Sequence, residues 1–242
     1  MSQVFKFSIF RFDPDEGKKP RFDNFDVPFK AGMTILDALF HIQGHIDTSL
    51  AFRFSCRAGV CGSCAMHIDG KYKLACETQA SIALNKRVTI RPIAHLPIIR
   101  DLVVDMKPFW DQYKRIIPYL MPGDVAPEGR ERYQTTSERQ KLDHVIDCIL
   151  CASCHSSCPM TASDPEYIGP AALLKANRFV VDSRDQSTAQ RLQMVGDEHG
   201  VWRCHTVFNC SLACPKDLDP AGSIANLKRE ATKNFLKKPS TR

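Results

Sequence analysis

The sequence contains no apolar run long enough to cross a lipid bilayer. Its first residues have neither the apolar core of a signal peptide nor the Arg- and Ser-rich composition of a transit region. We therefore expect a protein encoded for the cytosol, where thiols stay reduced. A P-loop and a G-x-G-x-x-G motif are also missing, so nucleotide binding has no support. The net charge of +6 is modest and spread along the chain, which predicts no nucleic-acid partner.

Cysteine, by contrast, is abundant, with 11 in 242 residues. Residues 148–159 have the spacing C-x2-C-x2-C-x3-C-P, and residues 204–215 repeat it with Val207 in place of the second cysteine. This is the spacing of bacterial ferredoxins, in which three close cysteines bind one iron–sulfur cluster and the distant fourth binds the other. The pattern predicts a [4Fe-4S] ligand set of Cys148, Cys151, Cys154 and Cys214. It also predicts a second, smaller set of Cys158, Cys204 and Cys210.

The second set has only three thiolates, because valine cannot bind iron. A cubane with one unligated corner readily loses that iron, so Val207 predicts a [3Fe-4S] cluster. An oxidised three-iron core is all ferric, and it accepts its first electron more easily than a four-iron core that is already half ferrous. The sequence therefore makes the Val207 cluster the expected high-potential end of an electron path.

Other uses of the cysteines fit less well. A disulfide framework conflicts with the odd count and with the expected reducing compartment. Structural zinc ribbons usually present two C-x2-C pairs, not three cysteines in series followed by C-P. A nucleophilic cysteine is not expected either, because the predicted clusters use all of the thiols.

A further cysteine motif lies in the first third of the chain. Its spacing is C-x4-C-x2-C followed by a fourth cysteine, which is the plant-type [2Fe-2S] spacing. Gly59 and Gly62 suit a loop that must wrap an inorganic cluster closely. Four reduced core cysteines are the alternative, but the clustering with glycine disfavours it. The predicted [2Fe-2S] ligands are Cys56, Cys61, Cys64 and Cys76.

The surrounding sequence predicts an α+β chain with two domains. Val4 to Phe12 and Phe22 to Phe29 read as strands, and Thr34 begins a helix with a capping-box-like pattern. This order is how a β-grasp, ferredoxin-like domain begins, and we assign it residues 1–103. Residues 104–242 are expected to form a mostly helical, bacterial-ferredoxin-like domain.

Four helical segments are expected in and before that second domain. Apolar residues recur at helical spacing from Ile98 to Trp110, and Ser137 to Asp147 should form a helix that leads to Cys148. Pro170 and Asp219-Pro220 are expected at the starts of two later helices. Residues 118–140 are rich in Pro, Gly and charge, and they should form a surface connection.

Five segments carry a resemblance to a known family: CRAGVCGSC at 56–64, CILCASCHSSCP at 148–159, IGPAALL at 168–174, VDSRD at 181–185 and RCHTVFNCSLACPKDLDP at 203–220. With the cluster order [2Fe-2S], [4Fe-4S], [3Fe-4S], the chain resembles the iron–sulfur subunits of succinate dehydrogenase and fumarate reductase nearly from end to end. These enzymes are the succinate:quinone oxidoreductases, or respiratory complex II.

The resemblance implies two kinds of partner. In this family a flavoprotein subunit oxidises succinate to fumarate on FAD, and one or two membrane anchors, often of cytochrome b type with haem, help bind quinone. The iron–sulfur subunit passes single electrons from flavin through its three clusters to quinone, which links the tricarboxylic acid cycle to electron transport. It has no catalytic residues of its own. The implied location is peripheral, on the cytoplasmic face of the inner (plasma) membrane.

The resemblance also implies a quinone pocket beside the [3Fe-4S] cluster. The matching positions are Pro159 and His205, with Val207 at the pocket edge and Arg203 as a link towards the anchor or its haem. A helix-end histidine bonded to backbone is the plainer interpretation of His205. Many ubiquinone-reducing relatives have a Trp-Trp pair shortly after the first C-P, but residues 160–165 contain no tryptophan. The usual indole hydrogen bond to quinone is therefore missing.

Two alternative functions remain open at this point. One is the corresponding subunit of a fumarate reductase that works in the reverse direction, with quinone or a soluble thiol as donor. The other is a free ferredoxin-like carrier, which is disfavoured because a small carrier rarely needs three clusters in line.

Overall fold

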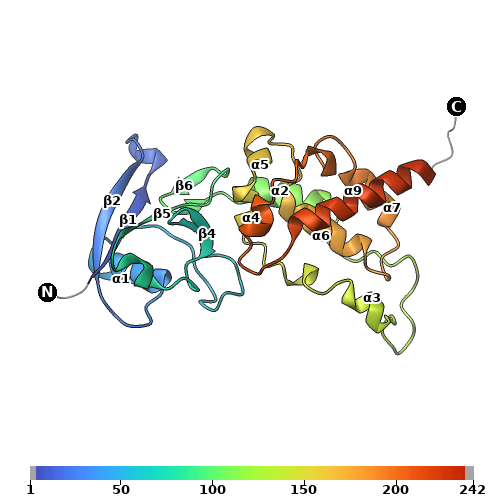
Figure 1. Cartoon of the computed structure of the whole chain (residues 1–242), viewed down its shortest axis with the longest axis horizontal. Coiled ribbons are helices and arrows are strands. Elements are labelled where there is room, and N and C mark those ends of the chain that lie inside the picture. The colour runs from blue at the N-terminus through green and yellow to red at the C-terminus, as the bar shows by residue number, and fades with distance from the viewer. Residues whose placement is uncertain (1–3, 238–242) are drawn as a thin grey trace. The chain divides into compact units, whose positions relative to one another are not determined.

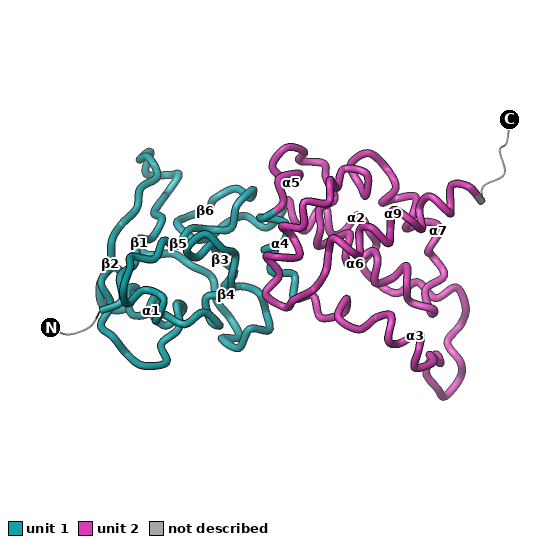
Figure 2. The backbone as a smooth tube through the Cα atoms, viewed as in Figure 1, with its two compact units in different colours: residues 1–107, 149–157 teal, residues 108–148, 158–242 magenta. Residues whose placement is uncertain are grey.

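The computed structural model describes residues 4–237, which form two compact units (Figures 1 and 2). Unit 1 comprises the chain up to residue 107 together with residues 149–157, and unit 2 comprises 108–148 and 158 onwards. Unit 1 is centred on a sheet and unit 2 is helical, so the predicted α+β class is confirmed. The boundary placed between residues 103 and 104 stays a prediction. Within residues 4–237, no helix combines the length and apolar character that crossing a bilayer requires.

A five-stranded sheet in the order β2-β1-β5-β3-β4 forms the centre of unit 1 (Figure 1). Strand β1 (Val4–Arg11) pairs antiparallel with β2 (Arg21–Pro28) and parallel with β5 (Arg87–Arg91). Strand β3 (Ala65–Ile68) pairs antiparallel with β5 and with β4 (Lys71–Leu74). The β3–β4 hairpin turns at Asp69-Gly70, whose left-handed φ angles of 48° and 83° suit the tight turn that this dipeptide predicts.

The core of unit 1 lies where the sheet meets helix α1 (Ile35–His45). The alternation in β1 turns Phe5, Phe7 and Ile9 inward, where each is at most 1% exposed. Burying such side chains stabilises the fold by about 1.5–3 kcal/mol each. Helix α1 begins at a capping box, in which the Thr34 hydroxyl accepts from the Asp37 amide (3.1 Å) and Asp37 accepts from the Thr34 amide (3.0 Å). The capping box expected from the sequence is thus confirmed.

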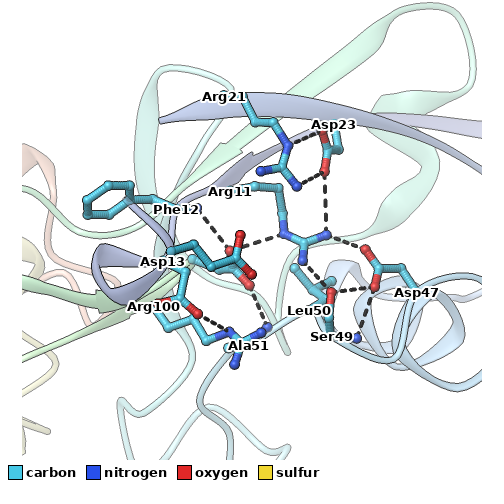
Figure 3. Close-up of polar contacts among 12 residues, drawn as sticks. Arg11, Phe12, Asp13, Arg21, Asp23, Asp47, Ser49, Leu50, Ala51 and Arg100 are labelled. Carbon is cyan, nitrogen blue, oxygen red and sulfur yellow. Dashed lines mark hydrogen bonds and ion pairs between the residues drawn. The ribbon is translucent and has the colours of Figure 1, made fainter. Parts of the chain in front are cut away.

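A buried arginine fastens the end of β1 to the segment before the predicted [2Fe-2S] loop (Figure 3). Arg11 is only 4% exposed, and its Nε donates to Asp101 Oδ1 at 3.1 Å. Its guanidinium also contacts Asp47 and donates to Ser49 Oγ at 2.6 Å. Asp101 Oδ2 in turn accepts from the Ala51 amide at 3.0 Å. Removing one member of a buried, hydrogen-bonded ion pair typically costs about 3–5 kcal/mol, so this network fixes where the loop starts.

The prediction of a helix from Ile98 to Trp110 is wrong for the first half of that segment. Residues Ile98–Arg100 form β6 and residues Val103–Val104 form β7, which pair antiparallel around an irregular turn. Asp101 at that turn has a left-handed φ of 45°, and its buried carboxylate holds Arg11. The buried ion pair thus favours a turn over the helix that the apolar spacing predicted. Helix α2 begins later, at Lys107–Arg115.

Unit 2 is a set of helices around α6 (Pro170–Val180). Helix α6 packs against α7 (Thr188–Val195) and against the long α9 (Pro220–Lys237). Between α6 and α9, Asn226 Nδ2 donates to Asn177 Oδ1 at 2.7 Å. The shorter helices and 3₁₀ turns of unit 2 are α3 (Thr136–Gln140), Val145–Asp147, α5 (Pro159–Ser163), Val201–Arg203 and α8 (Asn209–Leu212). In unit 1 they are Pro14–Glu16, Ala80–Ala83 and α4 (Ser153–Ser157).

The sequence located most of these helices, with one correction. Pro170 and Pro220 start α6 and α9 as expected. Residues 118–135 contain no helix or strand, but the last five residues of the connection expected at 118–140 form α3. The single helix expected from Ser137 to Asp147 is instead α3 followed by a separate 3₁₀ turn. His144 takes a left-handed φ of 66°, which interrupts the helix just before the first cysteine run.

Candidate iron–sulfur sites

The loop at residues 56–61 surrounds its first sulfur with backbone donors. The amides of Ala58, Val60 and Cys61 donate to Cys56 Sγ at 3.4, 3.3 and 3.3 Å. The Cys56 amide donates to Cys61 Sγ at 3.4 Å. Such donors stabilise negative charge on sulfur. The geometry therefore fits a thiolate that binds a metal cluster.

Gly62 is required both by conformation and by space. Its φ is 73°, in the left-handed region. A Cβ at this position would lie 2.7 Å from Cys151 Cβ and 2.9 Å from the carbonyl oxygen of Ile149, all within unit 1. This part of the first cysteine run therefore lies directly against the [2Fe-2S] loop.

The remaining cysteines of the first motif differ in environment. Cys64 and Cys76 are buried, and the Ala75 amide donates to the carbonyl oxygen of Cys64 at 3.0 Å. Burial raises the pKa of Cys64 to about 12. Burial also acts to raise the pKa of Cys61, but hydrogen bonds from Cys56 and Ser63 outweigh it and lower that pKa to about 6. Bound iron would deprotonate both thiols, since a coordinating thiol loses its proton outright.

The residues predicted for the three-iron site line a small hollow in unit 2. Its lining includes the three predicted ligands and three of the four predicted quinone-pocket residues, namely Cys158, Cys204, Cys210, Pro159, His205 and Val207. Burial, together with the nearby Cys158 and Cys204 thiols, raises the pKa of Cys210 to about 11. Burial likewise raises the pKa of Cys158. Three thiols at one hollow, two of them with a raised pKa, fit a shared group of positive iron ions.

Val207 occupies the same place in its loop as Cys151 does in the first run. Two and four residues after the first cysteine, both loops adopt left-handed φ: 55° and 62° at Leu150 and Ala152, and 56° and 64° at Thr206 and Phe208. Each loop then enters a short helix, α4 or α8. The second loop also places the Thr206 amide 3.4 Å from Cys204 Sγ. The backbones therefore repeat, and the middle side chain differs.

Arg203 does not line the hollow. Its NH2 group donates to Ser163 Oγ at 3.1 Å, and its Nε lies 3.4 Å from Asp164 Oδ2. Asp164 also accepts from His199 Nδ1 at 2.9 Å, and this hydrogen bond raises the pKa of His199. Sequence reasoning missed Asp164 and His199, because neither belongs to a cysteine motif. Together they hold Arg203, the residue before Cys204, in place.

Lys228 is a second residue that the sequence did not reveal. It lies on α9, and its Nζ donates to the carbonyl oxygen of Cys204 at 2.7 Å. The contact spans 24 residues of sequence. A helix lysine at that separation has no motif to mark it, so only the fold could find it.

Of the predicted [4Fe-4S] ligands, Cys151 and Cys154 belong to unit 1, and Cys148 and Cys214 belong to unit 2. Cys151 Sγ lies 3.4 Å from the hydroxyl of Ser153, which is fully buried. No disulfide joins any of the eleven cysteines, all of which lie within residues 4–237. The four-cysteine set itself stays a prediction.

Comparison with known proteins finds iron–sulfur families over both cysteine-containing regions. A family model described as a 2Fe-2S iron-sulfur cluster binding domain matches residues 6–111, and one described as a 4Fe-4S dicluster domain matches residues 144–218. The mitochondrial succinate dehydrogenase [ubiquinone] iron-sulfur subunit 1 of Oryza sativa subsp. japonica is 49% identical over 227 residues, which is 92% of this chain and 80% of the relative.

Two solved structures share the fold. A chain of the Mycobacterium smegmatis Sdh1 complex in the apo form is 24% identical and has a TM-score of 0.88, covering 99% of this chain and 100% of that chain. A hypothetical protein from Helicobacter pylori is 16% identical with a TM-score of 0.56, covering 100% of this chain and 41% of that chain. The predicted family is confirmed, and the fumarate reductase alternative is not favoured. The chain belongs to the family of succinate dehydrogenase iron–sulfur subunits.

Proposed function

We propose that this chain conducts single electrons from the FAD of a flavoprotein subunit to a membrane quinone. The observation that carries the proposal is the hollow in unit 2, where three cysteines meet and Val207 takes the place of a fourth. The bound clusters supply one-electron chemistry at neutral pH. The chain's own residues hold them, tune them and control what reaches them.

The ligand assignment follows the spacing. Cys56, Cys61, Cys64 and Cys76 hold the [2Fe-2S] cluster, and Cys148, Cys151, Cys154 and Cys214 hold the [4Fe-4S] cluster. Cys158, Cys204 and Cys210 hold the [3Fe-4S] cluster. The amides that donate to Cys56 Sγ stabilise the reduced form of the first cluster.

Val207 controls the third site in two ways. It withholds a ligand from the fourth corner, and its apolar side chain limits the access of water to the cluster sulfurs. It is half exposed, so it also stands at the surface where an electron acceptor can approach. These features favour the third cluster as the exit of the path.

The quinone is expected beside this hollow. Pro159 and His205 line it, and the His205 ring can donate an N–H to a quinone carbonyl oxygen or accept from a quinol hydroxyl. Arg203 donates to Ser163 and lies beside Asp164, so in this proposal it holds neighbouring residues of the pocket in place and does not contact the quinone. We assign a haem, where an anchor subunit carries one, to that partner.

The proposed partners are a FAD-containing flavoprotein and one or more membrane anchors, with the chain peripheral on the cytoplasmic face of the inner membrane. The test is purification from gently solubilised native membranes. We expect co-purification with a flavoprotein and an absorbance spectrum of covalently or tightly bound FAD. Alkaline or chaotropic washing should release both subunits from membranes. Recovery of the chain alone in the soluble fraction of gently broken cells would contradict the proposal.

A further inference from the structure

Arg57 stands beside the first cysteine with its side chain turned back onto an aromatic cluster. Its guanidinium carbon lies 4.6 Å from the ring centroid of Phe40, on α1, and 5.5 Å from that of Phe54. The two rings meet edge to face with centroids 4.6 Å apart, and Phe52 lies 5.4 Å from Phe40. A guanidinium that stacks on aromatic faces is held in place as well as attracted.

The backbone of Arg57 is in a conformation that needs such support. Its φ is 58°, in the left-handed region that L-residues with a Cβ adopt at an energetic cost. The next residues carry the amides of Ala58, Val60 and Cys61, all of which donate to Cys56 Sγ. The turn at Arg57 is therefore what aims these three donors at one sulfur.

We propose that Arg57 is a positioning residue, whose stack on Phe40 and Phe54 holds three backbone N–H groups on the Cys56 sulfur and thereby raises the reduction potential of the [2Fe-2S] cluster. This inference rests on the proposed function, which places that cluster at Cys56. Hydrogen bonds to sulfur favour the more negative, reduced cluster. Loosening the stack should therefore lower the potential.

The positive charge of Arg57 acts in the same direction, so the test must separate charge from stacking. Phe54→Leu removes one ring and keeps the arginine. Arg57→Lys keeps the charge but loses the planar group that stacks on both rings. Arg57→Ala removes both effects. The matched control is Arg91→Ala, since Arg91 stacks on Phe22 at 4.9 Å in the same unit.

The measurement is an EPR-monitored redox titration of the reduced [2Fe-2S] signal, made on the full-length chain in its holo complex. At the wild-type midpoint potential, we expect the ratio of reduced to oxidised cluster to fall about tenfold in Arg57→Ala and about threefold in Phe54→Leu and Arg57→Lys. A tenfold change is 59 mV for a one-electron couple. Arg91→Ala should stay within about twofold of wild type.

The outcomes separate the inference from the proposed function. If Phe54→Leu and Arg57→Lys both keep the [2Fe-2S] signal and the midpoint potential of wild type, the positioning role is overturned. This holds even if the potential of Arg57→Ala shifts through charge alone. Should Arg57→Ala fail to retain its cluster, these two variants still decide the matter. Complete absence of a [2Fe-2S] signal in the wild-type complex would overturn the proposed function itself.

Discussion

The two cysteine runs share a backbone but differ in how far they are enclosed. In the first run Ser153 and Ser156 are at most 1% exposed, and the hydroxyl of Tyr72 on β4 donates to the carbonyl oxygen of Ser156 at 2.9 Å. In the second run Val207 is 50% exposed and Leu212 is 85% exposed. Cysteine spacing and left-handed residues therefore set the loop, whereas the intervening side chains set cluster type and access.

This difference suits two roles in the proposed electron path. An enclosed run excludes water and fits an internal relay, which exchanges electrons only with neighbouring clusters. An open run that lacks one ligand fits a terminus, because an acceptor can approach it. The predictions below make one run more like the other, disturb the loop geometry that the runs share, or change a residue found beside only one of them.

The largest effect is expected when the first run is given the middle residue of the second. Cys151→Val should remove one ligand from the predicted [4Fe-4S] site without changing the left-handed residues around it. If a three-iron cluster forms, iron content should fall by about one atom per chain and the oxidised protein should gain a second near-isotropic EPR signal. If the cluster is lost, iron content should fall by about four atoms per chain. Iron analysis beside EPR checks this. An unchanged iron content and unchanged reduced [4Fe-4S] signal would contradict the assignment of Cys151.

The shared loop geometry is tested at Thr206, which has a φ of 56°. Proline cannot adopt that angle and also removes the amide that faces Cys204 Sγ. Thr206→Pro should therefore abolish the [3Fe-4S] signal and spare the [2Fe-2S] signal. Thr206→Gly should keep the signal and relieve a backbone cost of about 1–2 kcal/mol, offset in part by the freedom of glycine when unfolded. Full cluster occupancy in Thr206→Pro would show that the repeated backbone does not matter.

A smaller change is expected at His205, which lines only the second site. His205→Ala should lower quinone reduction by roughly tenfold, the effect of losing one good hydrogen bond to a bound group. Succinate oxidation by an artificial dye and the EPR signals of all clusters should stay largely intact. The opposite pattern, with loss of the [3Fe-4S] signal, would make His205 a structural support.

The smallest effect is a pH dependence near the second run. The hydrogen bond with Asp164 raises the pKa of His199, and the same bond lowers the pKa of Asp164. The stabilisation by protonated His199 is complete below its ordinary pKa of 6.5 and is lost as pH rises through the raised value. Thermal midpoints of wild type and His199→Gln should thus differ most below pH 6.5 and converge as the pH rises above the raised pKa of His199. A difference independent of pH would contradict the ion pair.

Motifs that depend on local chemistry were predictable from the sequence. The Thr34 capping box, the Asp69-Gly70 hairpin and the prolines that start α6 and α9 each act within a few residues. Cysteine spacing likewise singled out three cysteines that line one hollow in unit 2, because such spacing reflects the size of the cluster that it is predicted to bind.

Features that depend on distant side chains could not be predicted. The apolar spacing of residues 98–110 matched a helix, but Arg11 binds Asp101 across 90 residues and a turn forms instead. His144, with a left-handed φ of 66°, interrupts an otherwise helical stretch just before the first cysteine run, and no sequence pattern marks that break. The stack of Arg57 on Phe40 also joins separate segments, and no sequence pattern marks it.

The most direct test of the account is EPR of the oxidised protein, comparing wild type with Val207→Cys. Val207 stands where Cys151 stands in the repeated loop, so a cysteine there should supply the fourth ligand with little rearrangement. The account predicts a near-isotropic [3Fe-4S] signal in wild type that disappears in Val207→Cys, where a four-iron cluster of lower potential forms. Absence of this signal in wild type, or its persistence unchanged in Val207→Cys, would contradict the claim that Val207 occupies the vacant corner.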